Sequence, residues 1–333
     1  MIREGRVLLL AGTEAELATM PPGNWIGGTV GHFATPLCGV AAGGQILYAD
    51  FTAICTTACW RSFDAGDIHE IAHHYPANGF AILLLPGFSQ LLGSVAGHIM
   101  EYDGLYNLPL MGWVSAVALE GDAFHARPKV FAGGPQAHDE RAAVLYVGLA
   151  ERYFTQLHIA NLFAPGGGPE IRFPQPGQNI EGDCLIGGER GNLARYMAEQ
   201  QIDRRLPLVA DQDGALINVS ILSADAQTGR VMFLAPVSPA LSYRFAEEVV
   251  DYEAEFIRTA KEIESDGLTH ACICVLHFRY AGLTGPRDTR CRPDLVVPVT
   301  FGQIAYTVLN QTFACLTIGW SEEDEKEDGE VAA

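Results

Sequence analysis

The chain has 333 residues, of which 48% are hydrophobic and 18% charged, and its formal net charge is −19. This composition excludes global disorder, and the negative charge opposes binding to nucleic-acid phosphates and to anionic membrane surfaces. The length predicts about two domains. We therefore expect a folded protein with neither a nucleic-acid nor a membrane partner.

The sequence predicts a cytoplasmic location. The first apolar run, 7–11, is too short for the core of a signal peptide, and Glu14 and Glu16 follow it. The longest apolar run, around 80–86, is far below the roughly 20 residues that span a bilayer. Several of the eight cysteines lie among apolar residues, where a reduced thiol packs as a small hydrophobic group. A reducing compartment follows from these observations.

The first half of the chain is predicted to alternate short strands with short helices. The segment 64–75 has Ile68, Ile71 and Tyr75 at helical spacing and ends before Pro76, which favours an amphipathic helix. Further helices are expected at 14–19 and 91–100. Strands are expected at 7–11, 24–33, 45–55, 80–85, 110–119 and 142–149.

A turn-rich stretch, 164–191, separates this half from the second, where we expect helices at 193–201 and 242–264. Strands are expected within 206–222 and at 271–278 and 313–318. The order lacks a regular βαβ cadence, which favours an α+β fold of two pseudo-repeated lobes with mixed or antiparallel sheets flanked by helices. The predicted lobes are 1–190 and 191–320, followed by a disordered acidic tail, 321–333, with seven acids and one lysine.

One short pattern occurs in both halves. Thr29-Val30-Gly31-His32-Phe33 in the first half matches Thr300-Phe301-Gly302-Gln303-Ile304 in the second, and each precedes an apolar strand. A glycine permits a close approach that a Cβ would block. The polar residue after it, His32 or Gln303, is then expected at a strand edge, facing a ligand or a neighbouring strand.

These segments resemble the FIST family of sensory domains. The segment Trp25 to His32 is similar to that family's Gly-Cys-Ser-Thr-Ala-Gly-Glu turn, and 110–116 with 130–134 resembles a later glycine-rich segment. Thr300 to Ile304, followed by Asn310-Gln311-Thr312, resembles the family's C-terminal Tyr-Gly-Glu-Ile turn and Asn-Gln-Thr strand. Both family glutamates are replaced here, by His32 and Gln303, and Gly27 and Gly28 replace a cysteine and a serine.

The resemblance implies a sensory, signal-transducing protein that holds a small ligand near the interlobe glycine turns. A signalling kinase or cyclase would be its partner, and some relatives bind haem and sense nitric oxide. The ligand-binding residues expected on this basis are Thr29, His32, Thr300, Gln303 and Asn310. Arg172 is added because arginines cluster near the lobe boundary and could hold a carboxylate, although salt bridges with the many acids would explain them equally.

Metal and haem sites are alternatives. His69-Glu70-Ile71-Ala72-His73 matches the HExxH pattern of zinc enzymes, with Glu101 as a third ligand, although a solvated helix face would give the same letters. His32 and His158 are the candidate haem ligands, and a histidine satisfied by hydrogen bonds within the protein is the alternative for each.

A thiol-dependent enzyme is a further alternative, with Cys184 the candidate reactive thiol because glycine and polar residues flank it. No G-x-S-x-G elbow, Walker loop or dinucleotide-binding fingerprint is present, so a binding protein is favoured over an enzyme. The apolar content makes a homodimer plausible.

Overall fold

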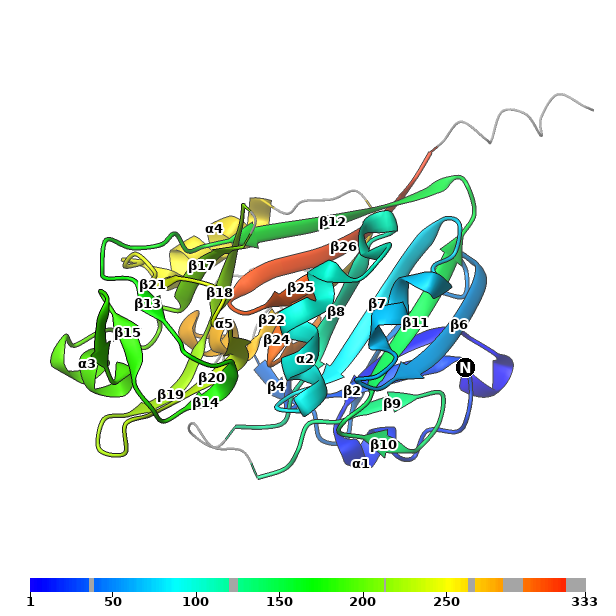
Figure 1. Cartoon of the computed structure of the whole chain (residues 1–333). Helices are drawn as coiled ribbons and strands as arrows, with labels where there is room; N and C mark the ends of the chain where they lie inside the picture. Colours follow the sequence, from blue (N-terminus) through cyan, green and yellow to red (C-terminus); the bar gives the residue numbers. More distant parts are fainter. Residues whose placement is uncertain (36–38, 120–124, 213, 263–266, 284–295, 322–333) are drawn as a thin grey trace, which may run out of the picture.

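The computed structural model describes residues 1–35, 39–119, 125–212, 214–262, 267–283 and 296–321. Within these ranges the strands form five sheets accompanied by a few short helices (Figure 1). The predicted α+β class with mixed and antiparallel sheets is confirmed. The predicted acidic tail lies outside the described residues, apart from Ser321.

Two sheets that are built mainly from the first half of the chain pack face to face. In the first sheet β1 and β2 are parallel and the other pairs are antiparallel. Its order is β10-β9-β2-β1-β5, with β1 Leu8–Gly12, β2 Trp25–Thr29, β5 Ile46–Asp50, β9 Val130–Ala132 and β10 Ala137–His138. The second sheet has the order β25-β24-β8-β7-β11-β6, with β6 Cys55–Phe63, β7 Gly79–Pro86, β8 Leu110–Ser115, β11 Ala142–Leu149, β24 Gly302–Ala305 and β25 Thr307–Leu309.

Strand β7 shows why the second sheet is central to the fold. All eight of its residues are buried, which fits a strand covered on both faces. Alternate side chains point to opposite faces, so Leu83 and Leu85 enter one core and Ile82 and Leu84 the other. The core that contains Ile82 and Leu84 also contains side chains of β1 and β8, and it fills the space between the first two sheets.

The third sheet joins the two ends of the chain. Its order is β12-β26-β22-β23-β3-β4, with β3 His32–Ala34, β4 Gly39–Ala41, β12 Tyr153–Asn161, β22 Leu268–Cys274, β23 Val297–Thr300 and β26 Thr312–Trp320. Strands β22 and β23 are parallel, and β23 pairs antiparallel with β3. The N-terminal and C-terminal parts of the sequence therefore share one sheet.

Residues 171–245 form a separate group of strands, here called the middle lobe. One of its sheets has the order β16-β15-β13-β21-β17-β18, with β13 Ile171–Arg172, β15 Cys184–Ile186, β16 Glu189–Gly191, β17 Leu208–Gln212, β18 Ala215–Val219 and β21 Tyr243–Phe245. The other has the order β14-β20-β19, with β14 Gly177–Ile180, β19 Ile221–Asp225 and β20 Arg230–Val237. These sheets share a core to which β24, β25 and β26 contribute Ala305, Leu309 and Ala314.

The sheets do not follow the expected boundary at residue 190. Strand β24 pairs with β8, and β26 pairs with β12, across that boundary. The chain builds the middle lobe after β12 and then returns to complete the sheets begun by its first half. Figure 1 shows the orange and red C-terminal strands between the green and yellow middle lobe and the blue and cyan strands.

The helices are short. The α-helices are α1 Glu14–Leu17, α2 Gln90–His98, α3 Leu193–Glu199, α4 Tyr252–Glu262 and α5 Val275–Tyr280, and the 3-10 helices are η1 Ile2–Glu4, η2 Ile68–His74, η3 Ile99–Glu101 and η4 Leu105–Asn107. Helix α2 is capped by Ser89, whose side chain accepts a hydrogen bond from the Leu92 amide. No helix in the described ranges is both long enough and apolar enough to cross a membrane.

Three helix and strand predictions are wrong in part. The segment 64–75 contains a 3-10 helix rather than an α-helix. The helix expected at 242–264 is preceded by strand β21 and begins only at Tyr252. The strand expected at 271–278 ends at Cys274, and α5 follows. Short apolar runs fit a strand and a buried helix equally well, so the contacts of α5 with α4 and β22 decide its conformation.

Candidate functional site

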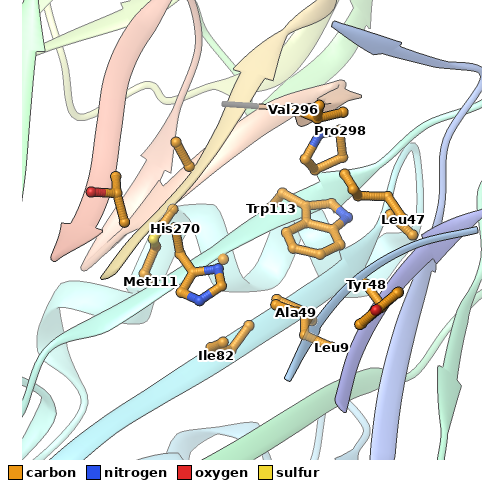
Figure 2. A pocket seen from close by; sticks show the side chains of 14 residues that line it. Leu9, Leu47, Tyr48, Ala49, Ile82, Met111, Trp113, His270, Val296 and Pro298 are labelled. Atoms are coloured by element: carbon orange, nitrogen blue, oxygen red, sulfur yellow. The ribbon is translucent and has the colours of Figure 1, made fainter. Parts of the chain in front are cut away.

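A pocket of about 300 Å³ opens where the first sheet ends at its edge strand β5 (Figure 2). Strands β1, β5, β7 and β8 form its walls, and β22 with the residues at and before the start of β23 closes another side. Its lining residues are mainly apolar: Leu9, Ala11, Leu47, Tyr48, Ala49, Ile82, Met111, Gly112, Trp113, Thr269, His270, Ala271, Val296 and Pro298.

Strand periodicity places these side chains in the pocket. Leu9 and Ala11 lie two apart on β1, Leu47 and Ala49 on β5, and Met111 and Trp113 on β8. The opposed faces of the two sheets therefore supply most of the wall. Because no strand of the described chain pairs with β5 on its outer side, the space between the sheets is open at this edge.

His270 is the most polar group of the wall. Its ring lies against Phe51, with ring centroids 4.7 Å apart, and Figure 2 shows it between Met111 and Ile82. Burial lowers the pKa of His270 to about 4, so the imidazole is uncharged at neutral pH. Within the described part of the chain, neither ring nitrogen has a hydrogen-bond partner. None of the lining residues that the structure describes carries a full charge at neutral pH.

Unpaired polar atoms gather beside the pocket. Four buried side-chain polar atoms lack a hydrogen-bond partner among the described residues, and Trp113 Nε1, Ser115 Oγ and Gln303 Oε1 are three of them. Trp113 and Ser115 lie two apart on β8 and share a face, and Gln303 on β24 is the register partner of Trp113. Buried polar groups are normally paired, so this cluster requires an explanation.

Gly28 on β2 faces the same cluster. A Cβ on Gly28 would lie 2.6 Å from Ser115 Oγ and 2.7 Å from Trp113 Nε1. Gly28 pairs in register with Ala11, which lines the pocket. Trp113 and Ser115 therefore pack directly against Gly28, and a side chain at this position would clash with both of their unpaired atoms.

A second group of buried polar side chains, here called the polar seam, joins the middle lobe to β26, α4 and α5. Its members are Asn161, Asn218, Ser220, Tyr252, His277 and Gln311. Ser220 Oγ donates to Gln311 Oε1 at 2.7 Å, and Gln311 Nε2 donates to the Tyr252 hydroxyl at 2.7 Å. That hydroxyl lies 2.8 Å from His277 Nδ1. The seam is therefore held together by its own hydrogen bonds.

His277 contributes the fourth unpaired polar atom, Nε2. The rings of Phe256 and Phe313 lie 5.3 and 5.1 Å from its ring. Burial lowers the pKa of His277 to about 3, so this imidazole also stays neutral. Aromatic packing and the bond to Tyr252 account for its position.

The two glycine bends of the sequence pattern lie side by side, because β3 pairs with β23 and places His32 opposite Val299. Their surroundings are densely packed. A Cβ on Gly31 would lie 2.4 Å from the Ala118 amide nitrogen, and one on Gly302 would lie 2.9 Å from the Leu309 carbonyl oxygen. Neither glycine leaves room for a ligand at its own position.

The side chains proposed to bind a ligand at these bends are engaged within the protein. Thr29 Oγ1 accepts from the Lys129 amide at 2.9 Å, and Thr300 Oγ1 donates to the Ile273 and Gly302 carbonyls. Asn310 Nδ2 donates to the Phe301 carbonyl at 3.0 Å. None of these residues lines the pocket described above. His32 does not line it either, but packs against Phe278.

Gln303 and Arg172 differ from that group. Gln303 is 1% exposed and lies next to Trp113, so it belongs to the unpaired cluster beside the pocket. Arg172 lies in the middle lobe, far along the chain from both bends, and pairs with Glu170 at 3.5 Å. Arg172 therefore forms a salt bridge with a neighbouring acid, which was the alternative to a carboxylate-binding role.

The predicted zinc site is wrong. His69 and His73 lie exposed on the 3-10 helix η2. With three residues per turn, positions four apart point about 120° away from each other, so they do not share a face. Across the described ranges, no group of three His, Cys, Asp or Glu side chains, including one with Glu101, is placed to hold a metal ion.

The two haem-ligand candidates are separated. His158 on β12 has its Nε2 3.1 Å from Thr317 Oγ1. Strand β12 is four places away from β3, which carries His32, and at a strand spacing of about 4.8 Å this corresponds to roughly 19 Å. The two imidazoles therefore do not face one iron, and neither of them lines the pocket.

Cys184 is not an exposed reactive thiol. It is 2% exposed, and its Sγ points to the Gly191 carbonyl oxygen at 3.4 Å. Burial raises the pKa of the Cys184 thiol to about 11, which disfavours the nucleophilic thiolate. The flanking glycine and aspartate in the sequence did not reveal that β15 turns this side chain inward.

Sequence reasoning missed the pocket residues Trp113 and His270. Trp113 was part of a predicted strand, and His270 immediately preceded another. The available signal was the period-2 pattern of Met111, Trp113 and Ser115, which places an indole N–H and a hydroxyl on one buried face. Nothing in the sequence indicated that β5 and β22 would lie opposite that face.

A family of unknown function (DUF6976) matches residues 1–319, and the chain belongs to this family. No curated protein and no solved structure matches it significantly. The resemblance to the FIST family is therefore wrong, because the family that spans the chain is a different one. A kinase or cyclase partner and a haem-dependent response to nitric oxide were implied by that resemblance, so they lose this support.

Proposed function

We propose that this protein binds a small, uncharged and largely apolar molecule in the pocket between β1, β5, β8 and β22. The observation that carries the proposal is a pocket of about 300 Å³ bordered by buried polar atoms that lack partners. Ligand sites are commonly mainly apolar, with a few polar groups that fix the orientation of the ligand. The apolar wall supplies affinity, and the unpaired atoms supply the positions that a ligand would satisfy.

The absence of charged side chains among the described lining residues favours an uncharged ligand. A buried carboxylate or ammonium without a partner is strongly disfavoured, and His270 stays neutral because burial lowers its pKa to about 4. A neutral imidazole offers one donor and one acceptor nitrogen. These groups suit a molecule with few hydrogen-bonding atoms on an apolar skeleton.

Binding, as in a cytoplasmic sensor or carrier, is favoured over catalysis. Among the described lining residues there is no serine or cysteine that His270 could activate, and the hydroxyl groups of the wall belong to Tyr48 and Thr269. The cytoplasmic location is part of the proposal, and the free state of Cys55, Cys59, Cys184, Cys272, Cys274 and Cys315 supports it. A homodimer stays a prediction from composition.

Equilibrium dialysis with naphthalene tests the proposal, since naphthalene is uncharged and fits an apolar pocket of this size. We expect one molecule bound per chain, and at least about tenfold weaker binding to Ala49→Trp, whose indole would occupy the pocket. Leu185→Trp, at a position 40% exposed in the middle lobe, is the control and should bind as the wild type does. Equal binding by all three folded proteins, or no binding at all, would overturn the proposal.

A further inference from the structure

The edges of two strands border the pocket. Its lining includes the consecutive residues 47–49 of β5 and 269–271 of β22. Successive side chains of a strand point to opposite faces, so three consecutive lining residues show that the strand meets the pocket with its edge, where its main-chain groups lie. Figure 2 shows Tyr48 and His270 on opposite sides of this space, with Trp113 between them.

The main chain of Tyr48 is directed to the open side of β5. In an antiparallel pair, alternate residues direct their N–H and C=O groups to the neighbouring strand, and the residues between them direct theirs away. Phe51 donates its N–H to the Val7 carbonyl at 3.0 Å, in register with the pairing of β5 and β1. Residues 47 and 49 therefore bond to β1, and Tyr48 does not.

The main chain of Ala271 is directed to the open side of β22 in the same way. Ser321, next to the end of β26, donates its N–H to the Arg152 carbonyl at 3.0 Å, so the odd-numbered residues of β26 bond to β12 and the even-numbered ones face β22. By register they meet the even-numbered residues of β22. Ala271 consequently directs its N–H and C=O away from β26.

Pro298 explains why the edge at Ala271 is open. Strand β23 lies on this side of β22 but pairs with it only at Ile273 and Cys274. The next bond of this parallel ladder would run from residue 298 to the Ala271 carbonyl, and proline has no N–H to donate. In the described part of the chain, no hydrogen bond reaches the main chain of Ala271 or Tyr48 from the pocket side.

The open main-chain groups restrict what can satisfy them. On one residue of a strand, the N–H donor and the C=O acceptor point the same way. An extended residue with a secondary amide on each side presents the complementary acceptor and donor at the same spacing. A hydrocarbon satisfies neither group, and a single hydroxyl cannot reach both.

We infer that the pocket takes a small ligand with secondary amide groups, of the size of one blocked amino-acid residue, which lies extended beside β22 and exchanges two hydrogen bonds with the main chain of Ala271. This inference rests on the proposed function and specifies its ligand class. A volume of about 300 Å³ is at the lower end for ligand pockets, which fits a ligand of this size. The apolar wall suits an aliphatic side chain, and the main chain of Tyr48 remains open to a further polar atom of the ligand.

Two matched probes test the inference: N-acetyl-leucine N′-methylamide, and its counterpart in which both amide nitrogens carry a further methyl group. The added methyl groups remove the N–H donors and keep the carbonyl groups and the leucine side chain. In the wild-type protein we expect the secondary amide to bind several-fold to about tenfold more tightly than its counterpart, the range for a neutral hydrogen bond. Equilibrium dialysis of the full chain at neutral pH measures both.

Two variants locate the effect. Pro298→Ala supplies an N–H that can donate to the Ala271 carbonyl, so the donor of the ligand loses its acceptor. The preference for the secondary amide should disappear, while naphthalene still binds within about threefold. Pro236→Ala, at a proline inside β20 of the middle lobe, is the matched control and should keep the preference.

Ala271→Pro changes the other side of the same contact. It removes a main-chain N–H that does not bond to β26, a position where a strand tolerates proline, and its ring obstructs the approach of the ligand. The secondary amide should then bind no better than its counterpart. Ala271→Ser keeps both main-chain groups and should retain the preference.

The outcomes separate this inference from the proposed function. If naphthalene binds wild type and the secondary amide binds no more tightly than its counterpart, the pocket binds ligands but the strand-edge site is refuted. The strand-edge site is refuted as well if Pro298→Ala and Ala271→Pro, both folded by circular dichroism, keep the preference. If no probe binds wild type, the proposed function itself fails. Should one of the two variants not fold, the other decides.

Discussion

The pocket and the polar seam both contain buried polar side chains in a largely apolar protein, but they differ in how those side chains are paired. In the seam, Gln311 alone joins Ser220, Tyr252 and the Arg205 carbonyl. Beside the pocket, Trp113 Nε1, Ser115 Oγ and Gln303 Oε1 have no partner in the described structure. The seam holds the middle lobe against the rest of the chain, whereas the cluster beside the pocket makes no comparable connection.

The difference shows that burial of polar groups does not by itself indicate function. A buried network whose members satisfy one another stabilises a specific arrangement, and its position between two parts of the fold explains it. Buried polar atoms without partners, next to an open pocket, point instead to a group that is supplied from outside. The predictions below test this distinction.

The largest effect is expected at Gln311. Gln311→Leu removes three hydrogen bonds and leaves the buried Ser220 hydroxyl without its acceptor, so we expect a loss of about 3 to 5 kcal/mol of unfolding free energy. Its φ of 43° adds to the effect, because leucine is disfavoured in that conformation. Urea denaturation measures it. Gln303→Leu, at the other buried glutamine, should lose only about 1 kcal/mol, and comparable losses at both positions would contradict the distinction.

The pH dependence of stability should come next in size. His270 has a pKa near 4 in the folded state and an ordinary value of 6.5, so the unfolded chain binds its proton first as the pH falls. The contribution of His270 to the free energy of unfolding is therefore fully present above about pH 6.5. As the pH falls toward 4, we expect this contribution to decrease by about 2 to 3 kcal/mol.

His270→Gln checks the assignment. Unfolding free energies measured from pH 7 to pH 4.5 should fall less steeply in this variant than in the wild type, because glutamine does not titrate. The carboxylates, and His277 in the seam, contribute equally to both proteins and cancel in the difference. Parallel curves would show that His270 is not held neutral beside the pocket.

The smallest change in unfolding free energy is expected when either of two serines is replaced by alanine. Both serines are completely buried. Ser220→Ala removes the donor to Gln311 Oε1 and should reduce the unfolding free energy by about 1 to 2 kcal/mol. Ser115→Ala removes a hydroxyl that has no partner, so the ligand-free protein should change by no more than about 0.5 kcal/mol or become slightly more stable. Chemical denaturation of both variants measures this, and a clear loss in Ser115→Ala would mean that its hydroxyl is satisfied after all.

Much of the local structure could be predicted from the sequence. The strands at 80–85 and 142–149 and the helix at 193–201 follow from apolar runs and periodicity, and they correspond to β7, β11 and α3. Residues 275–280 form an α-helix and 68–74 a 3-10 helix because of contacts with distant segments. No pattern within either segment specifies those contacts.

The candidate site was less predictable than the fold. The glycine pattern at Gly31 and Gly302 led to two bends that lie side by side but are packed with protein atoms. The glycine that contacts the unpaired groups is Gly28, a few residues away, and these groups, on Trp113 and Ser115, come from a strand more than 80 residues later. A glycine in a sequence indicates a close approach, but not what approaches it.

The sequence by itself determined the α+β class and the positions of several strands, including β1, β7 and β11, because these depend on the order of apolar and polar residues along a short stretch of chain. Only the tertiary structure decided that β5 would leave an open edge, that β22 would bring His270 to it, and that Trp113 and Ser115 would meet above Gly28. Those three facts depend on which strands pair and which sheets pack. Strand pairing is set by contacts summed over the whole molecule, so no local pattern specifies the pocket.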